Sequence, residues 1–390
     1  MCNEICGERM LTYKFRLYPT IAQEEKLLST LEACRYVYNY FIHNDYKTRN
    51  DMNYALTELK EQKSWLNNYH SKMLQMVSTQ VAGARKALEL KKKGHDAGIL
   101  CRKRDEYNTF IYNQSGFDID APDSILYLGK IGRIKMRMHR SIVGTIKQIA
   151  VKRRAGKWYA CITTDNNYRP VPSITKPIDI KKCVGIDVGI KNYTYDSDGN
   201  VTPNPENIKK MLKPLIRAQR KVSRRVKGSN NYKKARRWFQ IVHERIANRR
   251  KDFLHKLSTH YAKYDVIFLE RLRVNNMVKN HSLAMSIMDA SWSAFKQMLQ
   301  YKSKVMVEVE PVNTTIECSR CGKKVPKSLA VRMHRCDVCG LAIDRDYNAS
   351  LNILKKGLQL LELPMEYREV TPVEILMGSR KQEANALRCW

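Results

Sequence analysis

Residues 318–350 read CSRCGKKVPKSLAVRMHRCDVCGLAIDRDYNAS. This stretch holds two cysteine pairs, Cys318-x2-Cys321 and Cys336-x2-Cys339, with fourteen residues between the pairs. Four thiolates at this spacing can close a tetrahedron around Zn²⁺, so the pattern predicts a zinc ribbon. Since all four ligands are protein thiolates, no position stays open for water, and we expect one structural zinc ion per chain.

An acidic segment directly follows the second cysteine pair. We expect Asp346 to open a helix over residues 346–358. Asn348 lies two residues later on the same predicted helix, at a fixed position relative to Asp346. The simplest alternative is that Asp346 only caps this helix by accepting amide N–H groups. Asp344 is a rival for a functional role, and we favour Asp346.

Two more acids follow apolar runs far upstream. Asp187 lies in VGIDVG and Glu270 in VIFLE, each at the end of a predicted buried strand. Acids at the exits of apolar strands lie at a sheet edge, where loops form clefts, so Asp187, Glu270 and Asp346 are predicted to converge as a catalytic site. Carboxylates suit hard cations, and two Mg²⁺ ions about 4 Å apart can clamp an in-line attack on phosphate. Taken alone, Asp187 could be a turn former and Glu270 a solvated strand end.

The overall charge points to a polyanionic partner. The chain has 390 residues, and its 71 Lys and Arg exceed its 38 Asp and Glu by 33. This excess argues against a small-molecule substrate and favours nucleic acid, because each neutralised phosphate releases condensed counterions. A basic membrane-surface protein is the competing interpretation. We see no apolar run of about 18 residues and no signal or lipidation motif, so we expect no membrane partner and a cytoplasmic, nucleoid-associated location in a prokaryotic-type cell.

Residues 208–251 carry almost half of this excess, with 17 Lys and Arg against one acid, Glu244. The pattern predicts helices over about 206–262 with a break at Gly228. A charge run is usually a solvated face, but two like-charged helices repel each other unless an anion lies along them. We therefore expect contact with phosphate backbones here. The candidate residues are Arg217, Arg220, Arg224, Lys233, Arg236 and Arg237.

The first half of the chain has a different pattern. It predicts a strand over 11–19, helices over 21–93, an irregular segment over 94–115, short strands over 117–165 and a proline-marked domain boundary over 166–177. Within the helices, Lys72, Gln75 and Gln80 could share a face that reads DNA bases, although a solvated face is the commoner explanation.

Two expectations concern the second half. Residues 284–303 predict a single helix. Asp196 and Asp198 lie in a predicted turn, and we interpret both as solvated.

Several segments carry a resemblance that extends over nearly the whole chain. In order, they are YKFRLYPT, CRYVYNYF, GKIGRIKMRMHR with GKWYA, GIDVGIKNY, HERIANRRKDFLHKLS, MDASWSAFKQMLQYKSK, CSRCG, CDVCG and DRDYNASLNIL. Each segment alone is weak evidence, but the combination in this order is specific. The chain resembles the TnpB family, transposon-encoded RNA-guided DNA endonucleases (OrfB-type "transposases") that are related to type V CRISPR effectors.

The resemblance implies a multidomain α/β fold. The implied parts are a wedge-type β-barrel (1–19 and 116–170), an inserted helical recognition lobe (20–115), a RuvC-like nuclease domain of RNase H fold (171–312 and 344–360), an inserted zinc ribbon (313–343) and a variable tail (361–390). By position, the family's three RuvC acids fall on Asp187, Glu270 and Asp346, the same acids that the residue pattern favours.

The resemblance also implies partners and a reaction. A guide RNA derived from the transposon end would pair with double-stranded target DNA beside a short flanking motif, so that base pairing reads the sequence and the protein reads shape and motif. The predicted activity is RuvC-type DNA cleavage with two Mg²⁺, beside one structural Zn²⁺. The alternatives are an RNA-guided DNA-binding regulator that does not cut and a transposase that acts on element ends. The oligomeric state stays open.

The chain departs from the family pattern at two places. Arg271 follows Glu270 where the family usually has an acid, and Thr314-Thr315-Ile316-Glu317 precedes the first ribbon cysteine where the family usually reads like TSQ. Neither departure involves a predicted ligand, but both could alter the electrostatics of the cleft and the path of the nucleic acid.

Overall fold

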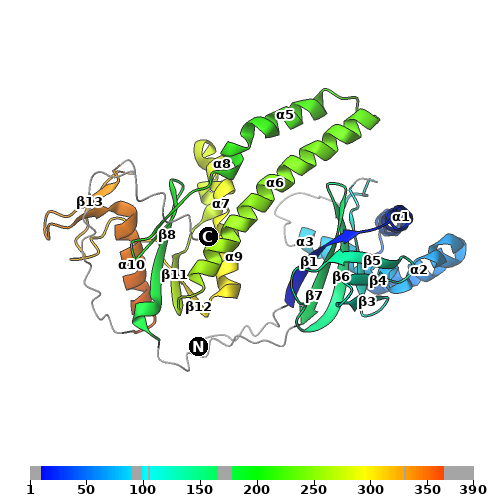
Figure 1. Ribbon diagram of the computed structural model, residues 1–390, viewed down its shortest axis with the longest axis horizontal. Helices are drawn as coiled ribbons and strands as arrows, with labels where there is room; N and C mark the ends of the chain where they lie inside the picture. Colours follow the sequence, from blue (N-terminus) through cyan, green and yellow to red (C-terminus); the bar gives the residue numbers. More distant parts are fainter. Residues whose placement is uncertain (1–9, 90–98, 104–105, 166–177, 329–330, 364–390) are drawn as a thin grey trace. The chain divides into compact units, whose positions relative to one another are not determined.

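The computed structural model describes residues 10–89, 99–103, 106–165, 178–328 and 331–363, and the chain divides into two compact units, 1–169 and 170–390 (Figure 1). The predicted boundary segment 166–177 and the tail from residue 364 onward lie outside the described residues. The fold is mixed α/β, with one large sheet in each unit.

The first unit is built on a seven-stranded antiparallel sheet of order β2-β6-β7-β1-β5-β4-β3. Alternate residues of these strands are buried, as in Tyr13, Phe15 and Leu17, which is the pattern of a sheet with one face against a core. The strands are β1 (Met10–Tyr18), β2 (Thr109–Asn113), β3 (Phe117–Asp120), β4 (Ile125–Leu128), β5 (Gly132–Arg137), β6 (Thr145–Arg154) and β7 (Lys157–Asp165).

Helices pack against the buried face of this sheet. Capping boxes start two of them, because Thr20 exchanges hydrogen bonds with Gln23, and Thr48 with Asp51. The elements are α1 (Ile21–His43), α2 (Arg49–Gln62), the 3-10 turn η1 (Ser64–Asn68) and α3 (Ser71–Glu89). The helical stretch predicted over 21–93 is therefore confirmed up to residue 89, with breaks between the helices, and its last residues, 90–93, lie outside the described residues.

The irregular segment predicted over 94–115 is wrong at its end. Residues 109–113 form strand β2, which pairs with β6. Phe110 and Tyr112 are buried on alternate positions, and this pattern of two aromatic residues is too short to stand out from the polar sequence around it.

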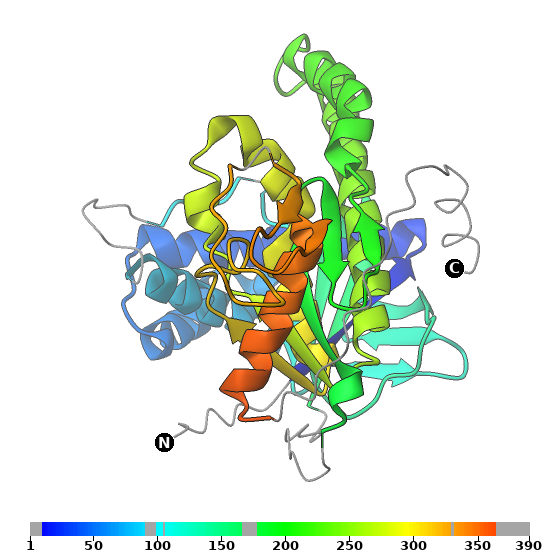
Figure 2. The same cartoon turned by 90° about the vertical axis from the view of Figure 1, so that its left-hand side faces the viewer.

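The second unit contains a five-stranded sheet of order β10-β9-β8-β11-β12 (Figure 2). β8 and β12 run parallel to β11, while β9 runs antiparallel to β8 and to β10. The strands are β8 (Cys183–Val188), β9 (Asn192–Asp196), β10 (Val201–Pro203), β11 (Val266–Glu270) and β12 (Val305–Val309).

Both faces of the parallel strands are covered, which explains why β8 and β11 read as continuous apolar runs. On β11, Val266 and Phe268 pack with Ile353 of α10 (Arg345–Leu360), whereas Ile267 and Leu269 pack against the opposite layer. That layer comprises α6 (Asn230–Tyr261), α8 (His281–Ala290) and α9 (Trp292–Lys302). Figure 2 shows α10, in orange, lying along the sheet.

The basic stretch forms a helical hairpin. After the short α4 (Asn207–Lys210), α5 (Leu212–Ser223) and α6 run side by side and extend beyond the sheet of this unit (Figures 1 and 2). The predicted break near Gly228 is confirmed, since helix stops at Ser223 and resumes at Asn230.

The single helix predicted over 284–303 is wrong. Ser291 adopts φ +54°, which ends α8 and starts α9. The left-handed backbone conformation is costly for a serine. The tertiary packing of both helices therefore overrides the preference of this sequence for one continuous helix. The remaining short elements are η2 (Ile180–Lys182), α7 (Val274–Met277), β13 (Met333–Arg335) and β14 (Ala342–Asp344).

Across the described ranges, no helix has the length and apolar character needed to cross a membrane.

Candidate functional site

Two acids lie next to each other at one edge of the five-stranded sheet. β8 and β11 run parallel, and the last registered pair between them joins Ile186 with Leu269. Asp187 and Glu270 are the next residues along the two strands. They therefore occupy equivalent positions at the carboxyl ends of neighbouring strands.

Both acids point to the face that α10 covers, because residues two apart on a strand share a face. Gly185, two residues before Asp187, lies so close to α10 that a Cβ would collide with the backbone of Ser350 and Leu354. Phe268, two residues before Glu270, also lies close to α10. A Cβ added to Gly357 of that helix would collide with the Phe268 ring. Glycine at both points lets the helix approach the strands closely.

The first turn of α10 carries the third acid, Asp346. Asp344 is the N-cap of this helix, since its carboxylate accepts the backbone N–H groups of Asp346 at 2.8 Å and Tyr347 at 3.4 Å. Capping thus occupies the carboxylate of the rival acid Asp344, whereas the Asp346 carboxylate caps no backbone N–H among the described residues. That carboxylate lies 3.0 Å from the Arg345 guanidinium and 3.4 Å from that of Arg332.

Like charges meet at this site. Burial raises the pKa of Asp187 well above its usual range, and the charges of Glu270 and Asp346 raise it further, while Arg345 acts in the opposite direction. Burial also raises the pKa of Glu270, against the lowering effects of the Thr314 hydroxyl and of the Lys356 charge. Carboxylate oxygens are the ligands that a hard divalent ion takes, so a cation bound among these three would offset their repulsion. Among the described His, Cys, Asp and Glu side chains, only the four ribbon cysteines already have their ligand atoms gathered at metal-binding spacing.

Arg271 does not neutralise this cluster. Its guanidinium lies 2.6 Å from Glu310 and 3.5 Å from Glu308, next to the edge strand β12. The departure from the family pattern is therefore compensated by partners outside the acid cluster.

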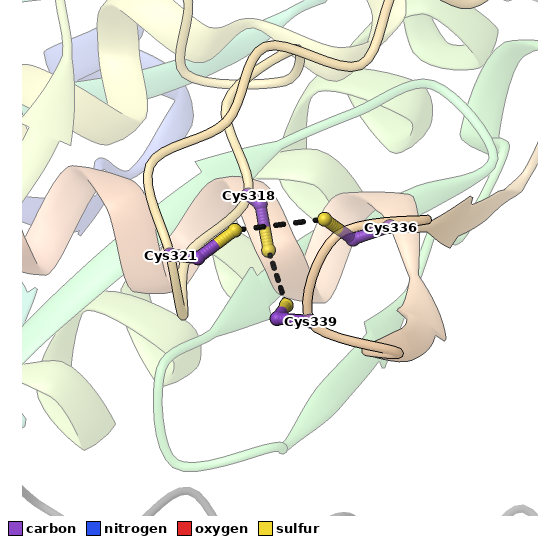
Figure 3. A group of neighbouring side chains, drawn as sticks. All are labelled: Cys318, Cys321, Cys336 and Cys339. Carbon is purple, nitrogen blue, oxygen red and sulfur yellow. Dashed lines mark hydrogen bonds between the residues drawn. The ribbon is translucent and has the colours of Figure 1, made fainter.

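The four ribbon cysteines are gathered as a metal site requires (Figure 3). Their sulfurs all lie within 4.8 Å of one another, with 3.6 Å between Cys318 and Cys339 and 3.5 Å between Cys321 and Cys336. In a zinc tetrahedron with Zn–S bonds of about 2.3 Å, the sulfurs are about 3.8 Å apart. The donors and their spacing therefore fit Zn²⁺, and the four cysteines could hold one structural ion.

The sequence did not reveal the contact between the segment before the ribbon and Glu270. The Thr314 side-chain oxygen lies 3.0 Å from Glu270 Oε1, and Thr314 is 1% exposed. No local pattern marks a threonine in this role, because its partner lies forty-four residues away in the chain.

Most candidate phosphate contacts lie on the outer surface of the α5–α6 hairpin. Leu215, Ala218, Phe239, Val242 and Ile246 form its apolar seam. Arg217, Arg220, Arg224, Lys233 and Arg237 are exposed, and Arg236 is half-buried.

Asp289 of α8 fixes the base of the hairpin and was not predicted. Its carboxylate is nearly buried and accepts hydrogen bonds from the backbone N–H of Ile208 at 2.8 Å and from the guanidinium of Arg250 at 3.1 Å. It thereby ties α4 and α6 to α8.

The base-reading candidates of the first unit lie on α3. Lys72 and Gln75 are exposed, whereas Gln80 is half-buried and accepts a hydrogen bond from the Tyr107 hydroxyl at 2.7 Å. The structure therefore does not place Gln80 with the other two as a freely exposed side chain.

The interpretation of Asp196 as solvated is wrong. Its side chain is fully buried and accepts hydrogen bonds from the backbone N–H groups of Asp198 and Asn200 at 3.0 and 2.8 Å. The Tyr261 hydroxyl of α6 lies 3.4 Å away and helps to cover this turn.

Three family models match the chain. One described as "Probable transposase", of the OrfB group, matches residues 163–281, and one described as "Cas12f1-like, TNB domain" matches residues 292–353. A third, described as "Helix-turn-helix domain", matches residues 10–50, where the structure has β1, α1 and the start of α2.

Relatives match at nearly full length. The "Putative RNA-guided DNA endonuclease InsQ" of Escherichia coli (strain K12) is 30% identical over 387 residues, covering 91% of this chain and 94% of the relative. A protein of Streptomyces pristinaespiralis with the same general description is 33% identical over 370 residues, 89% of each chain. A solved structure of CasPhi-2 (Cas12j) bound to crRNA shows 9% identity over 92% of this chain and 99% of its own, with a TM-score of 0.45, which is too low to establish a shared fold.

Proposed function

The chain belongs to the TnpB family of OrfB-type probable transposases, and on this premise we propose that it is an RNA-guided DNA endonuclease. Full-length similarity to proteins described as RNA-guided DNA endonucleases supports the general activity. The observation that carries the proposal for this chain is the placement of Asp187 and Glu270 at neighbouring strand ends, with Asp346 near enough for its charge to raise the pKa of Asp187.

We propose that the five-stranded sheet is the RNase H-type core of a RuvC-like domain. Three parallel strands extended by the antiparallel β9–β10 hairpin, with helices on both faces, support this assignment. The proposed divisions are the RuvC-like domain at 171–312 and 344–360, the zinc ribbon at 313–343, and a wedge-type barrel with a helical lobe in the preceding residues.

In the proposed reaction, the three carboxylates would hold the metal. Two Mg²⁺ ions held by Asp187, Glu270 and Asp346 would supply an activated water and stabilise the attacking and leaving oxygens of the scissile phosphate. The half-buried, mutually repelling carboxylates favour this role, because the same charges are costly without a cation. Arg345 and Arg332 beside Asp346 add positive charge where a phosphate would approach.

The proposed zinc site has a different role. Cys318, Cys321, Cys336 and Cys339 would close the coordination sphere of one Zn²⁺ with thiolates, which leaves no position for substrate or water. We assign this ion to the folding of the ribbon and not to the chemistry.

The proposed partners are a guide RNA from the transposon end and a double-stranded DNA target next to a short flanking motif. Exposed arginines and lysines on the α5–α6 hairpin would contact phosphates, which bind through charge without reading sequence. Lys72 and Gln75 on α3 are candidates for contact with the flanking DNA, and Gln80 is a weaker one because Tyr107 engages it.

Substitution of the three acids tests the proposal. Asp187→Ala, Glu270→Ala and Asp346→Ala should each abolish cleavage of a guide-matched target in Mg²⁺ while guide RNA binding persists. Asp252→Ala is the matched control, since Asp252 is exposed on α6 and forms an ion pair along the helix with Lys256 at 3.1 Å. Retained cleavage in the Asp187 variant would overturn the assignment.

The non-cutting regulator has no observation in its favour. The case for it rests on Arg271, and the carboxylates of Glu308 and Glu310 engage that side chain. A transposase would instead transfer strands of element ends without guide RNA, and a strand-transfer assay with RNase-treated protein separates the two activities.

A further inference from the structure

The segment that leads into the zinc ribbon also contacts the acid cluster. Thr314 is 1% exposed, and its side-chain oxygen lies 3.0 Å from Glu270 Oε1 and 3.3 Å from the carbonyl oxygen of Pro311. Donation to the carboxylate works against the rise in the pKa of Glu270 that burial causes. One oxygen of Glu270 is thus held while Oε2 has no side-chain hydrogen bond within the described ranges.

A row of polar side chains on α10 holds the same segment from the other side. Asn352 Nδ2 donates to the carbonyl oxygens of Thr314 at 2.8 Å and Glu317 at 2.7 Å. Asn348, one turn earlier, donates to the Glu317 carbonyl at 2.7 Å and accepts the backbone N–H of Ser319 at 2.9 Å. Both asparagines are buried, with 3% and 0% exposure, so breaking these bonds would leave buried polar groups without partners.

These contacts join three parts of the proposed machinery. Cys318 lies between Glu317 and Ser319, the two residues that Asn348 holds, so the first zinc ligand belongs to the clamped segment. Asp346 lies two residues before Asn348 on the same helix. The segment 314–319 therefore connects the ribbon, the helix of one acid and the side chain of another.

We propose that Thr314 is a positioning residue for the metal-binding carboxylate of Glu270, and that Asn352 couples this position to the zinc ribbon. The inference rests on the proposed function, because it assigns Glu270 to metal binding. It gives the ribbon a second role: it holds the segment whose hydroxyl fixes the orientation of a catalytic carboxylate. A correctly oriented ligand binds its metal without first losing rotamer freedom, so the loss of such a partner weakens metal affinity.

The test compares Thr314→Val, which keeps the shape and removes the hydroxyl, with Thr314→Ser, which keeps the hydroxyl. Mn²⁺ serves as the probe and is titrated into the full-length, zinc-loaded protein, with free Mn²⁺ measured by electron paramagnetic resonance. We expect Thr314→Val to weaken Mn²⁺ affinity on the order of 10- to 100-fold and Thr314→Ser to stay close to wild type. Zinc content should remain one ion per chain in both variants.

Asn352→Leu tests the coupling to the ribbon, since it keeps the approximate size of the side chain and removes the clamp without touching either metal site. It should weaken Mn²⁺ binding in the same direction as Thr314→Val. Unchanged Mn²⁺ affinity in the Asn352→Leu variant would overturn the coupling.

Three further results decide the Thr314 role. Wild-type affinity in Thr314→Val, an equal loss in Thr314→Ser, or loss of zinc from Thr314→Val would each overturn positioning by the hydroxyl. Failure of the proposed function looks different: wild-type protein would then show no Mn²⁺ binding that Asp187→Ala removes.

Discussion

Asp187 and Glu270 each follow the same registered pair, Ile186 with Leu269, on two parallel strands of one sheet. This register places two carboxylates next to each other at the carboxyl edge and on the face that α10 covers. Asp346 reaches the same face because α10 approaches the strands closely at Gly185 and Gly357. The acid site is therefore a consequence of strand register and helix packing. Arg345 and Lys356 offset part of its repulsion, and a bound cation would offset more.

Removing one charge should stabilise the metal-free protein. Folding raises the pKa of Asp187, so its proton is retained in the native state where the unfolded chain has lost it. The protonated Asp187 side chain therefore favours the native state. Its contribution to stability is complete below the pKa that Asp187 has in the unfolded chain, and it is lost as pH rises through the pKa that Asp187 has in the folded protein. In chelator at pH 7, Asp187→Asn should raise Tm by about 2–4 °C for each kcal/mol recovered and should flatten the dependence of Tm on pH.

Thermal unfolding of Asp252→Asn supplies the control, since that exposed acid forms an ion pair with Lys256 on the same helix. A lower Tm for Asp187→Asn than for wild type in chelator would show that the carboxylate is stabilised without metal and would contradict this electrostatic account.

The close approach of α10 should tolerate no side chain at residue 185. A Cβ there collides with the backbone of Ser350 and Leu354, and backbone cannot move aside cheaply. Gly185→Ala should reduce the free energy of unfolding by about 2–4 kcal/mol through overpacking, as measured by denaturant titration.

Gly83→Ala is the opposite case and the matched control. Gly83 is exposed on α3, with no atom within 4 Å of the position of an added Cβ. This substitution should stabilise the protein by about 0.4–1 kcal/mol, because alanine restricts the unfolded chain. Equal effects of the two substitutions would be inconsistent with tight contact between β8 and α10.

One zinc ion should accompany each chain through purification. Elemental analysis should show a zinc-to-protein ratio near one in wild type and near zero in Cys318→Ser, because three thiolates leave the tetrahedron incomplete. Cys101→Ser, at an exposed cysteine outside the ribbon, should retain zinc. Zinc-free wild-type protein from zinc-supplied cells would argue against the site.

The α5–α6 hairpin should contribute charge and not sequence readout. The triple variant Arg217→Gln, Arg220→Gln, Arg224→Gln should weaken binding to unrelated duplexes uniformly. The slope of log K against log salt should fall by about 0.9 for each phosphate that the variant no longer neutralises. Fluorescence anisotropy over a salt series measures this slope.

The corresponding triple Lys variant keeps the charges and should retain the wild-type slope. If the Gln variant also keeps that slope, these arginines do not contact phosphate.

The proposed acid site could be located from the sequence because its signals are local. An apolar run that ends in an acid marks Asp187 and Glu270, and paired cysteines mark the ribbon. The sequence favours Asp346 over Asp344 through its relation to Asn348 and the following helix, and the structure adds that Asp344 caps this helix.

The errors arose where tertiary contacts decide. Asp196 has the local sequence of a solvated turn, but Tyr261 from a distant helix covers it. Ser291 interrupts a helical pattern because two helices pack separately. Thr314 acquires its contact through a partner forty-four residues away, which no periodicity encodes.

The most direct test of the central claim is to co-express the protein with its flanking DNA, sequence the RNA that co-purifies, and offer the complex plasmids that carry the matching target beside randomised flanks in Mg²⁺. The account predicts one discrete RNA and cleavage only beside one enriched flanking motif, with no cleavage by Asp187→Ala. Co-purified RNA with target binding but no cleavage by the wild-type protein, or the absence of any defined RNA, would contradict it.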